Sequence, residues 1–255
     1  MEASVGTAYS DLLEMTKKKK CRFLTIILSA LVIALVLRAF VFESYKMPSP
    51  QMEDALLKGD YLFVNKFAYG VRMPITWLSF PFVPDYIPAW GIKTYSPRFP
   101  LPYTRIFERG VERNDVVLYN IPLLQKDLPI DKLPLSISRC TGLPGDSIEV
   151  LNHKLFIPKR GYALILTPEK LHIYGQIILG EQKSKATIEN GILYINNKPV
   201  SLYIFKSDYY WMMGDNTEAS ADSRHFGFIP KSHIVGKVEL IWKSKDLNRI
   251  FSRVH

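Results

Sequence analysis

Residues 136–151 read SISRCTGLPGDSIEVL and combine two short strand-like runs with a turn between them. Ser136–Thr141 and Asp146–Leu151 have the length and composition of β-strands bounded by turn residues. Gly142–Asp146 holds two glycines and a proline, which favour a turn. The stretch therefore predicts a strand, a turn and a second strand.

The same pattern recurs along most of the chain. Asn196-Asn197 is a further turn signal. After residue 43, no segment shows sustained helical periodicity, and nothing repeats at a period of roughly 20 to 50 residues. We therefore expect a mainly β fold, an antiparallel barrel or sandwich. Its other predicted strands are Asp60–Phe67, Asp115–Asn120, Ile192–Ile195, Tyr209–Met213 and Ile234–Trp242.

Composition excludes several classes of protein. The chain has 255 residues, of which 47% are hydrophobic and 22% charged, so wholesale disorder is excluded. Two cysteines cannot form a disulfide framework or a four-thiolate zinc site. The five histidines show no His-Glu-x-x-His spacing. We expect neither a metal nor a cofactor.

The net charge of +9 is spread unevenly. Four consecutive lysines occupy positions 17–20, whereas residues 43–255 carry only a mild basic excess. This part has no second basic arm and no nucleic-acid motif. We expect no nucleic-acid partner.

An apolar run at residues 23–42 contains a single charge, Arg38, near one end. As a helix, it would span about 30 Å, the thickness of a bilayer core. The alternatives are a buried core helix and a cleaved signal peptide, but Arg38-Ala39-Phe40-Val41 offers no small-x-small cleavage site. The lysines predict a cytoplasmic segment at 1–22, an anchor in the inner membrane at 23–42 and an exported domain at 43–255.

Two stretches of the exported part are less defined. Prolines and aromatics crowd Pro74–Tyr103, which predicts irregular structure, either a packed loop or a surface at the membrane interface. Residues 152–189 have fewer turn signals, and we expect a small accessory lobe there.

Three segments carry motifs in a fixed order. They are MPSPQM at 47–52 with LLKGD at 56–60, NDVV at 114–117 with SRCTGLPGD at 138–146, and MGDN at 213–216 with SADSR at 220–224. Behind one N-terminal apolar segment, they resemble bacterial type I signal peptidases, the membrane-anchored Ser/Lys proteases that remove signal peptides from exported precursors. The resemblance covers most of residues 38–240.

The resemblance implies a mainly β catalytic domain at the outer membrane surface. It also implies a groove that takes an extended signal peptide with small side chains at its cleavage site. Met47, Pro48 and Ile137 fall on the positions that line the pockets for those side chains.

Both catalytic positions of the family are substituted. Aligned without a gap, the family's nucleophilic serine falls on Gln51 and its general-base lysine on Ser138. A glutamine amide is not a nucleophile, and a serine hydroxyl does not accept a proton near neutrality. Loss of such groups costs up to about 10⁶ in turnover. We therefore expect Ser/Lys endopeptidase activity to be lost. Pro50, Asp54 and Ala55 also depart from the family pattern.

Other positions of the family site are retained. Ser49 matches the side-chain contributor to the oxyanion hole, and Ser220 matches the serine that orients the lysine. Asp222 and Arg224 match a salt-bridging pair that holds the last motif in shape. Gly214, Asp215 and Asn216 form the structural turn of that motif. Each of these also has a purely structural interpretation.

Three alternatives stay open. A substitute nucleophile, Ser49 or Cys140, would need a base, and no lysine lies between Leu133 and Leu151. The second alternative is an active signal peptidase whose catalytic groups are disguised. The third is a non-enzymatic adaptor that binds signal peptides or an active signal peptidase paralogue.

Overall fold

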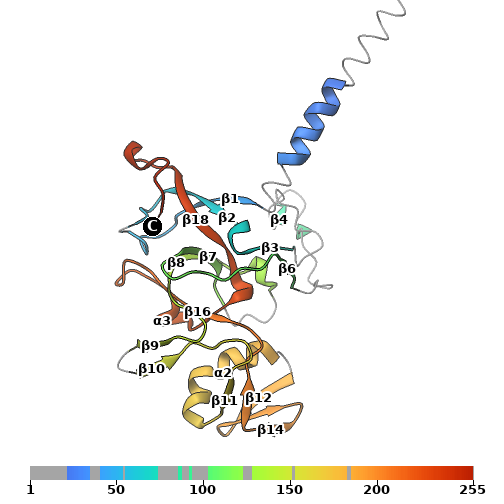
Figure 1. The fold of residues 1–255 in the computed structure, drawn as a ribbon, viewed down its shortest axis with the longest axis vertical. Helices are drawn as coiled ribbons and strands as arrows, with labels where there is room; N and C mark the ends of the chain where they lie inside the picture. Colours follow the sequence, from blue (N-terminus) through green and yellow to red (C-terminus); the bar gives the residue numbers. More distant parts are fainter. Residues whose placement is uncertain are drawn as a thin grey trace, which may run out of the picture.

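The computed structural model describes residues 22–34, 41–53, 55–73, 86–87, 92–93, 103–122, 128–150, 153–182 and 185–254. Residues 22–34 form a helix that stands apart from a mainly β body (Figure 1). Among the described residues, no helix combines the length and apolarity that a membrane crossing requires. The predicted anchor at 23–42 lies partly outside the described residues.

A seven-stranded sheet forms the centre of the body. Its strand order is β1-β2-β18-β7-β8-β16-β17, and all neighbouring strands are antiparallel. The predicted antiparallel, mainly β fold is therefore confirmed. The strands are β1 (Phe42–Lys46), β2 (Tyr61–Asn65), β7 (Val116–Asn120), β8 (Leu135–Gly142), β16 (Tyr209–Met213), β17 (Ile229–Pro230) and β18 (Ile234–Lys243).

Smaller ribbons surround this sheet. The pairs are β3 (Val71–Arg72) with β6 (Arg105–Ile106), β4 (Tyr86–Ile87) with β5 (Ile92–Lys93), β9 (Ser147–Val150) with β10 (His153–Phe156), and β11 (Ala163–Ile165) with β15 (Leu202–Ile204); β12 (Ala186–Glu189), β13 (Ile192–Ile195) and β14 (Lys198–Val200) form a three-stranded sheet. Every strand that the sequence predicts is present. The predicted turn at 142–146 leads from β8 into β9, which leaves the central sheet to pair with β10.

The predicted turn Asn196-Asn197 joins β13 to β14. Both asparagines have positive φ, 51° and 62°. Two consecutive residues with positive φ are typical of the turn that closes a tight hairpin, and asparagine tolerates this conformation.

The sequence shows no sustained helical periodicity after residue 43, yet the structure forms a helix in this part of the chain. Helix α2 spans Pro168–Gln182 and packs on β12 and β13. Its buried residues are Leu171, Tyr174, Gly175 and Ile178, which do follow the helical spacing. Exposed Ile173 on another face blurs this pattern in the sequence. The remaining short helices are α3 (Ser223–Phe226), η1 (Phe67–Tyr69), η2 (Ile130–Lys132), η4 (Lys231–His233) and η5 (Leu247–Arg249).

Separate apolar clusters cover the two faces of the central sheet. Leu118 and Ile137 are buried in one cluster, whereas Tyr119 and Cys140 are buried in the other. Because side chains alternate along a strand, Ser138 lies on the same face as Cys140. The residue at the family's base position therefore points toward the cluster that contains Tyr119.

Most of the Pro-rich stretch Pro74–Tyr103 lies outside the described residues, and only the short strands β4 and β5 and Tyr103 belong to them. The expected lobe at 152–189 contains β10, β11, α2 and β12. Its core continues beyond residue 189, since Leu193, Tyr203 and Phe205 are buried in the same cluster as Leu171 and Ile178.

Candidate functional site

The first and third motif segments meet at Gly214, directly after β16. A Cβ atom at position 214 would lie 2.6 Å from the backbone oxygen of Gln51 and in collision with Oγ of Ser220. The backbone N–H of Asn216 donates to that same oxygen of Gln51 at 3.1 Å. The structure thus brings together residues that are far apart in the sequence.

This close approach predicts that Gly214→Ala destabilises the protein. The added methyl group needs room that only a backbone shift can supply, so we expect a loss of about 1 to 3 kcal/mol in the free energy of unfolding. Chemical denaturation measures the effect. Gly110→Ala, where a Cβ would meet nothing within 4 Å, is the control. Equal losses in the two variants would contradict the packing at Gly214.

The loop that carries Gln51 is fixed at both ends. It joins β1 to β2, and the N–H of Met47 donates to the oxygen of Asp60 at 2.8 Å. The carboxylate of Asp60 in turn accepts from Oγ of Ser244 at 2.7 Å and from Nη2 of Arg249 at 3.2 Å. Residues beyond β18 therefore hold the loop that contains the family's nucleophile position.

The Gln51 side chain is buried, and its amide nitrogen has two acceptors. Nε2 donates to Oγ of Ser136 at 3.0 Å and to the backbone oxygen of Ile137 at 2.6 Å. Both N–H bonds of the amide are used. The side chain at the nucleophile position is thus a hydrogen-bond donor tied to β8.

The carbonyl that Gln51 binds faces the open side of β8. Within the described residues, β16 pairs with β8 only from Arg139 to Gly142. The N–H of Cys140 donates to the oxygen of Asp115 at 2.8 Å, at the start of β7. Since backbone groups alternate in direction along a strand, the carbonyl of Ile137 points away from β7. An extended peptide added at this edge would use that carbonyl.

Ser138 is fully buried, and its hydroxyl lies 3.1 Å from the hydroxyl of Tyr119. Burial raises the pKa of Tyr119 despite the hydrogen bonds from Ser138 and Ser136. The phenol is therefore neutral at physiological pH. The space beside the base position holds neutral hydroxyl groups.

No hydrogen bond described at Gln51, Ser138 or Ser220 comes from a lysine or a histidine. Their side-chain partners within the described residues are Ser136, Tyr119 and Asp222, together with backbone groups. A hydroxyl can attack a carbonyl only if a neighbouring group accepts its proton. Neither Gln51 nor Ser138 has such a base among its described hydrogen-bond partners.

The retained acidic motif is built around Asp222, which is 0% exposed. Its carboxylate accepts from Oγ of Ser220 at 2.8 Å and from the N–H of Gly214 at 2.9 Å. Arg224 donates to it through Nε at 3.0 Å and Nη2 at 2.9 Å. Burial alone would raise the pKa of Asp222, but these hydrogen bonds outweigh it and hold the pKa below its usual value.

A second ion pair fixes the same loop to β8. Arg139 donates to the Asp215 carboxylate through Nε at 2.8 Å and Nη2 at 2.7 Å. A bidentate pair of this kind restricts orientation. Asp215 therefore has a structural contact, as Asp222 has. Ser220 donates a hydrogen bond to Asp222, and no lysine is among its hydrogen-bond partners in the described part of the chain.

The other predicted residues divide between the surface and the core. Ser49 is half-buried in a bend, and Pro48 is exposed. Met47 and Ile137 are buried in one apolar cluster. Residues 49–51 bend and turn, so Ser49 and Gln51 do not lie on one face of an extended strand.

The other proposed nucleophile, Cys140, is buried, and burial raises the pKa of its thiol to about 12. We expect Cys140 in a Cys21→Ser background to react with a thiol reagent at least about 10²-fold more slowly in the folded protein than in denaturant. Spectroscopic titration with a disulfide reagent measures this rate. Rapid modification of the folded protein would restore Cys140 as a candidate nucleophile.

Sequence reasoning missed Tyr119 and Ser136. The strands were predicted, but their register was not, and register places Tyr119 opposite Ser136 and Val117 opposite Ser138. The alternation of the two strands, once paired, would have put Tyr119 on the Ser138 face.

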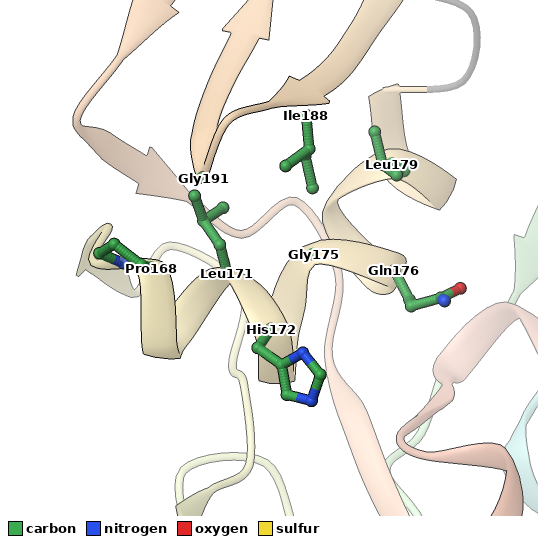
Figure 2. Close-up of a pocket in the computed structure, with 8 residues that line it drawn as sticks. All are labelled: Pro168, Leu171, His172, Gly175, Gln176, Leu179, Ile188 and Gly191. Atoms are coloured by element: carbon green, nitrogen blue, oxygen red, sulfur yellow. The ribbon is translucent and has the colours of Figure 1, made fainter.

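A separate groove of about 320 Å³ runs along α2 and is shown in Figure 2. His172 and Gln176 line it together with apolar residues such as Leu179 and Ile188. Its lining includes no carboxylate, thiol or hydroxyl group that could act with His172. Within the described residues, no group of His, Cys, Asp and Glu could hold a metal ion.

Comparisons with known proteins give a family match and several relatives. Residues 20–243 match the sequence profile of a family described as signal peptidase, peptidase S26. A protein of Buchnera aphidicola named signal peptidase I is 29% identical over 89% of this chain and 77% of its own length. Proteins of the same name from Rickettsia typhi and Pseudomonas aeruginosa are also 29% identical; each match covers 84% of this chain, with 77% and 69% of the relatives.

Proposed function

The chain belongs to the signal peptidase family, peptidase S26, and from the altered cleft we propose that it handles the signal peptides of exported precursors without cleaving them by a Ser/Lys mechanism. Its substrates in this proposal are extended signal peptides at the extracytoplasmic face of the inner membrane, with the chain anchored through residues 23–42. The partner is the uncleaved precursor.

One observation carries this proposal. The amide of Gln51 stands where the attacking oxygen would be and donates to Ser136 and the carbonyl of Ile137. At the base position, Ser138 shares a hydrogen bond with Tyr119. The groups that would attack and deprotonate are replaced by a connected neutral network whose donors have acceptors.

The names of the relatives favour the rival function, an active signal peptidase. Incubating the full-length protein in membrane vesicles with a labelled preprotein distinguishes the two. We expect the intact precursor to copurify with the protein and no mature product to form. Mature product with the N-terminus of a processed protein would contradict the proposal. Absence of the precursor from the purified protein would contradict it as well.

The hydrogen bond from Gln51 to the carbonyl of Ile137 predicts that Gln51→Ala binds signal peptides more tightly than the wild type. Removing the amide leaves this strand-edge carbonyl free to accept from a bound peptide. A hydrogen bond of this kind contributes about 1 kcal/mol, so we expect about fivefold tighter binding. Fluorescence anisotropy with a labelled signal peptide measures the change. Lys58→Ala, an exposed change in the same loop, is the matched control. Weaker binding by Gln51→Ala would show that the amide contacts the peptide instead.

A further inference from the structure

The ribbon formed by β11 and β15 has an unusual outer face. Leu164 and Tyr203, which are paired across the ribbon, are 5% and 3% exposed and point into the core beneath it. On the opposite face, Ile165 is 66%, Leu202 49% and Ile204 55% exposed. Because Ile165 lies opposite Leu202, and Ile204 is two residues further along, these side chains form one apolar strip.

Both edges of this ribbon are open within the described part of the chain, where β11 and β15 pair only with each other. The N–H of Leu166 donates to the oxygen of Ser201, and that of Phe205 donates to the oxygen of Tyr162. The alternation of an antiparallel pair then directs the backbone groups of Ile165, Leu202 and Ile204 outward. The strip is therefore bordered by strand edges that can accept another strand.

Basic side chains lie at one end of the strip. Arg160 precedes β11, Lys206 follows β15, and both are exposed. The nearby Glu181 carboxylate accepts hydrogen bonds from the hydroxyls of Tyr203 and Tyr209. Residues 151–206 contain eight Lys and Arg against three Asp and Glu. The stretch of chain that contains the strip therefore has a clear basic excess.

The charge and position of the strip decide between its candidate occupants. A second copy would bring two basic surfaces together, and a few side chains cannot bury the roughly 800 Å² per partner of a stable interface. Figure 1 shows β11 at the end of the molecule opposite the helix at residues 22–34, away from the predicted anchor. A partner protein with acidic residues fits better than either another copy or a lipid surface.

We propose that the β11–β15 ribbon is a docking surface for an extended segment of a partner protein in which apolar residues alternate and acidic residues follow at one end. The segment adds as a strand to an open edge of the ribbon. The apolar side chains of the partner segment extend the apolar strip of Ile165, Leu202 and Ile204, and its carboxylates lie beside Arg160 and Lys206. This interaction is independent of the cleft at Gln51.

The test uses the full chain in detergent micelles and a fluorescent peptide in which valine alternates with threonine and a Glu-Glu pair closes one end. Anisotropy should show saturable binding to the wild type. We expect the double variant Ile165→Asp with Leu202→Asp to bind at least about tenfold more weakly, because it places charge in the strip. Ile192→Asp, at another exposed isoleucine, should bind as the wild type does. Circular dichroism checks that each variant is folded.

A version of the peptide ending in Lys-Lys should bind at least about tenfold more weakly than the acidic one. Absence of binding to the wild type, or equal binding by the double variant, would overturn the proposal. Two further results would replace the occupant and also overturn it. One is dimerisation in light scattering that the double variant abolishes, and the other is binding of anionic vesicles that the double variant abolishes.

Discussion

Gln51→Ser combined with Ser138→Lys is expected to generate signal peptidase activity, with mature product forming on the order of 10³-fold faster than with the wild type. Intact catalytic groups contribute up to about 10⁶ in proteases of this kind. We expect less here because Pro50 fixes the backbone next to the new serine. The fully buried position of Ser138 provides the desolvation that lowers the pKa of a lysine amine toward neutrality.

Tyr119 limits the cleavage rate that the double variant can reach. Its hydroxyl lies 3.1 Å from Oγ of Ser138, in the space that a longer side chain would enter. Adding Tyr119→Phe to the double variant should therefore increase the rate again. Each single variant should be inactive, because it supplies a nucleophile without a base or the reverse. A folded double variant that produces no mature protein would show that more than these two groups was lost.

Arg224→Ala is expected to lower the free energy of unfolding by about 3 to 5 kcal/mol, the usual cost of leaving a buried charge without its partner. Asp222 is 0% exposed and accepts two hydrogen bonds from the Arg224 guanidinium. Denaturant unfolding measures the loss. Arg113→Ala is the matched control, since its ion pair with Asp146 is exposed and should contribute at most about 1 kcal/mol. Equal losses of unfolding free energy in the two variants would contradict the view that Arg224 compensates the buried charge of Asp222.

The same carboxylate predicts acid sensitivity. Because the folded protein holds the pKa of Asp222 below its usual value, its contribution to stability is fully present above the unfolded-state pKa of about 3.9. The contribution is lost as the pH falls through the lower, folded-state pKa. Unfolding followed between neutral and acidic pH should show this loss in the wild type and much less of it in Asp222→Asn. Identical dependence of stability on pH in the wild type and in Asp222→Asn would show that Asp222 does not cause the acid sensitivity.

The strands were predictable because each is a short run between turn residues. The pairing of β9 with β10 and the register of β7 against β8 depend on contacts between distant residues, which strand propensity does not encode. Helix α2 was missed for a related reason. Its buried face is set by packing on β12 and β13, and Ile173 exposes an apolar side chain on another face.

The residues of the candidate site were predicted from motif order, and the structure places Gln51, Gly214 and Ser220 side by side. The sequence did not reveal what fills the cleft. The hydrogen bonds of Gln51 to Ser136 and Ile137, and of Ser138 to Tyr119, depend on side-chain directions that only the folded chain determines. These contacts account for how an amide and a hydroxyl are accommodated where a dyad would stand.

Cleavage of a labelled preprotein by stoichiometric amounts of wild-type protein and of Gln51→Ala, followed by mass spectrometry, tests the absence of a catalytic dyad most directly. We predict that neither protein produces mature product faster than buffer alone. Mature product from the wild type, formed at the signal peptide junction and abolished by Gln51→Ala, would show that the cleft still performs proteolysis.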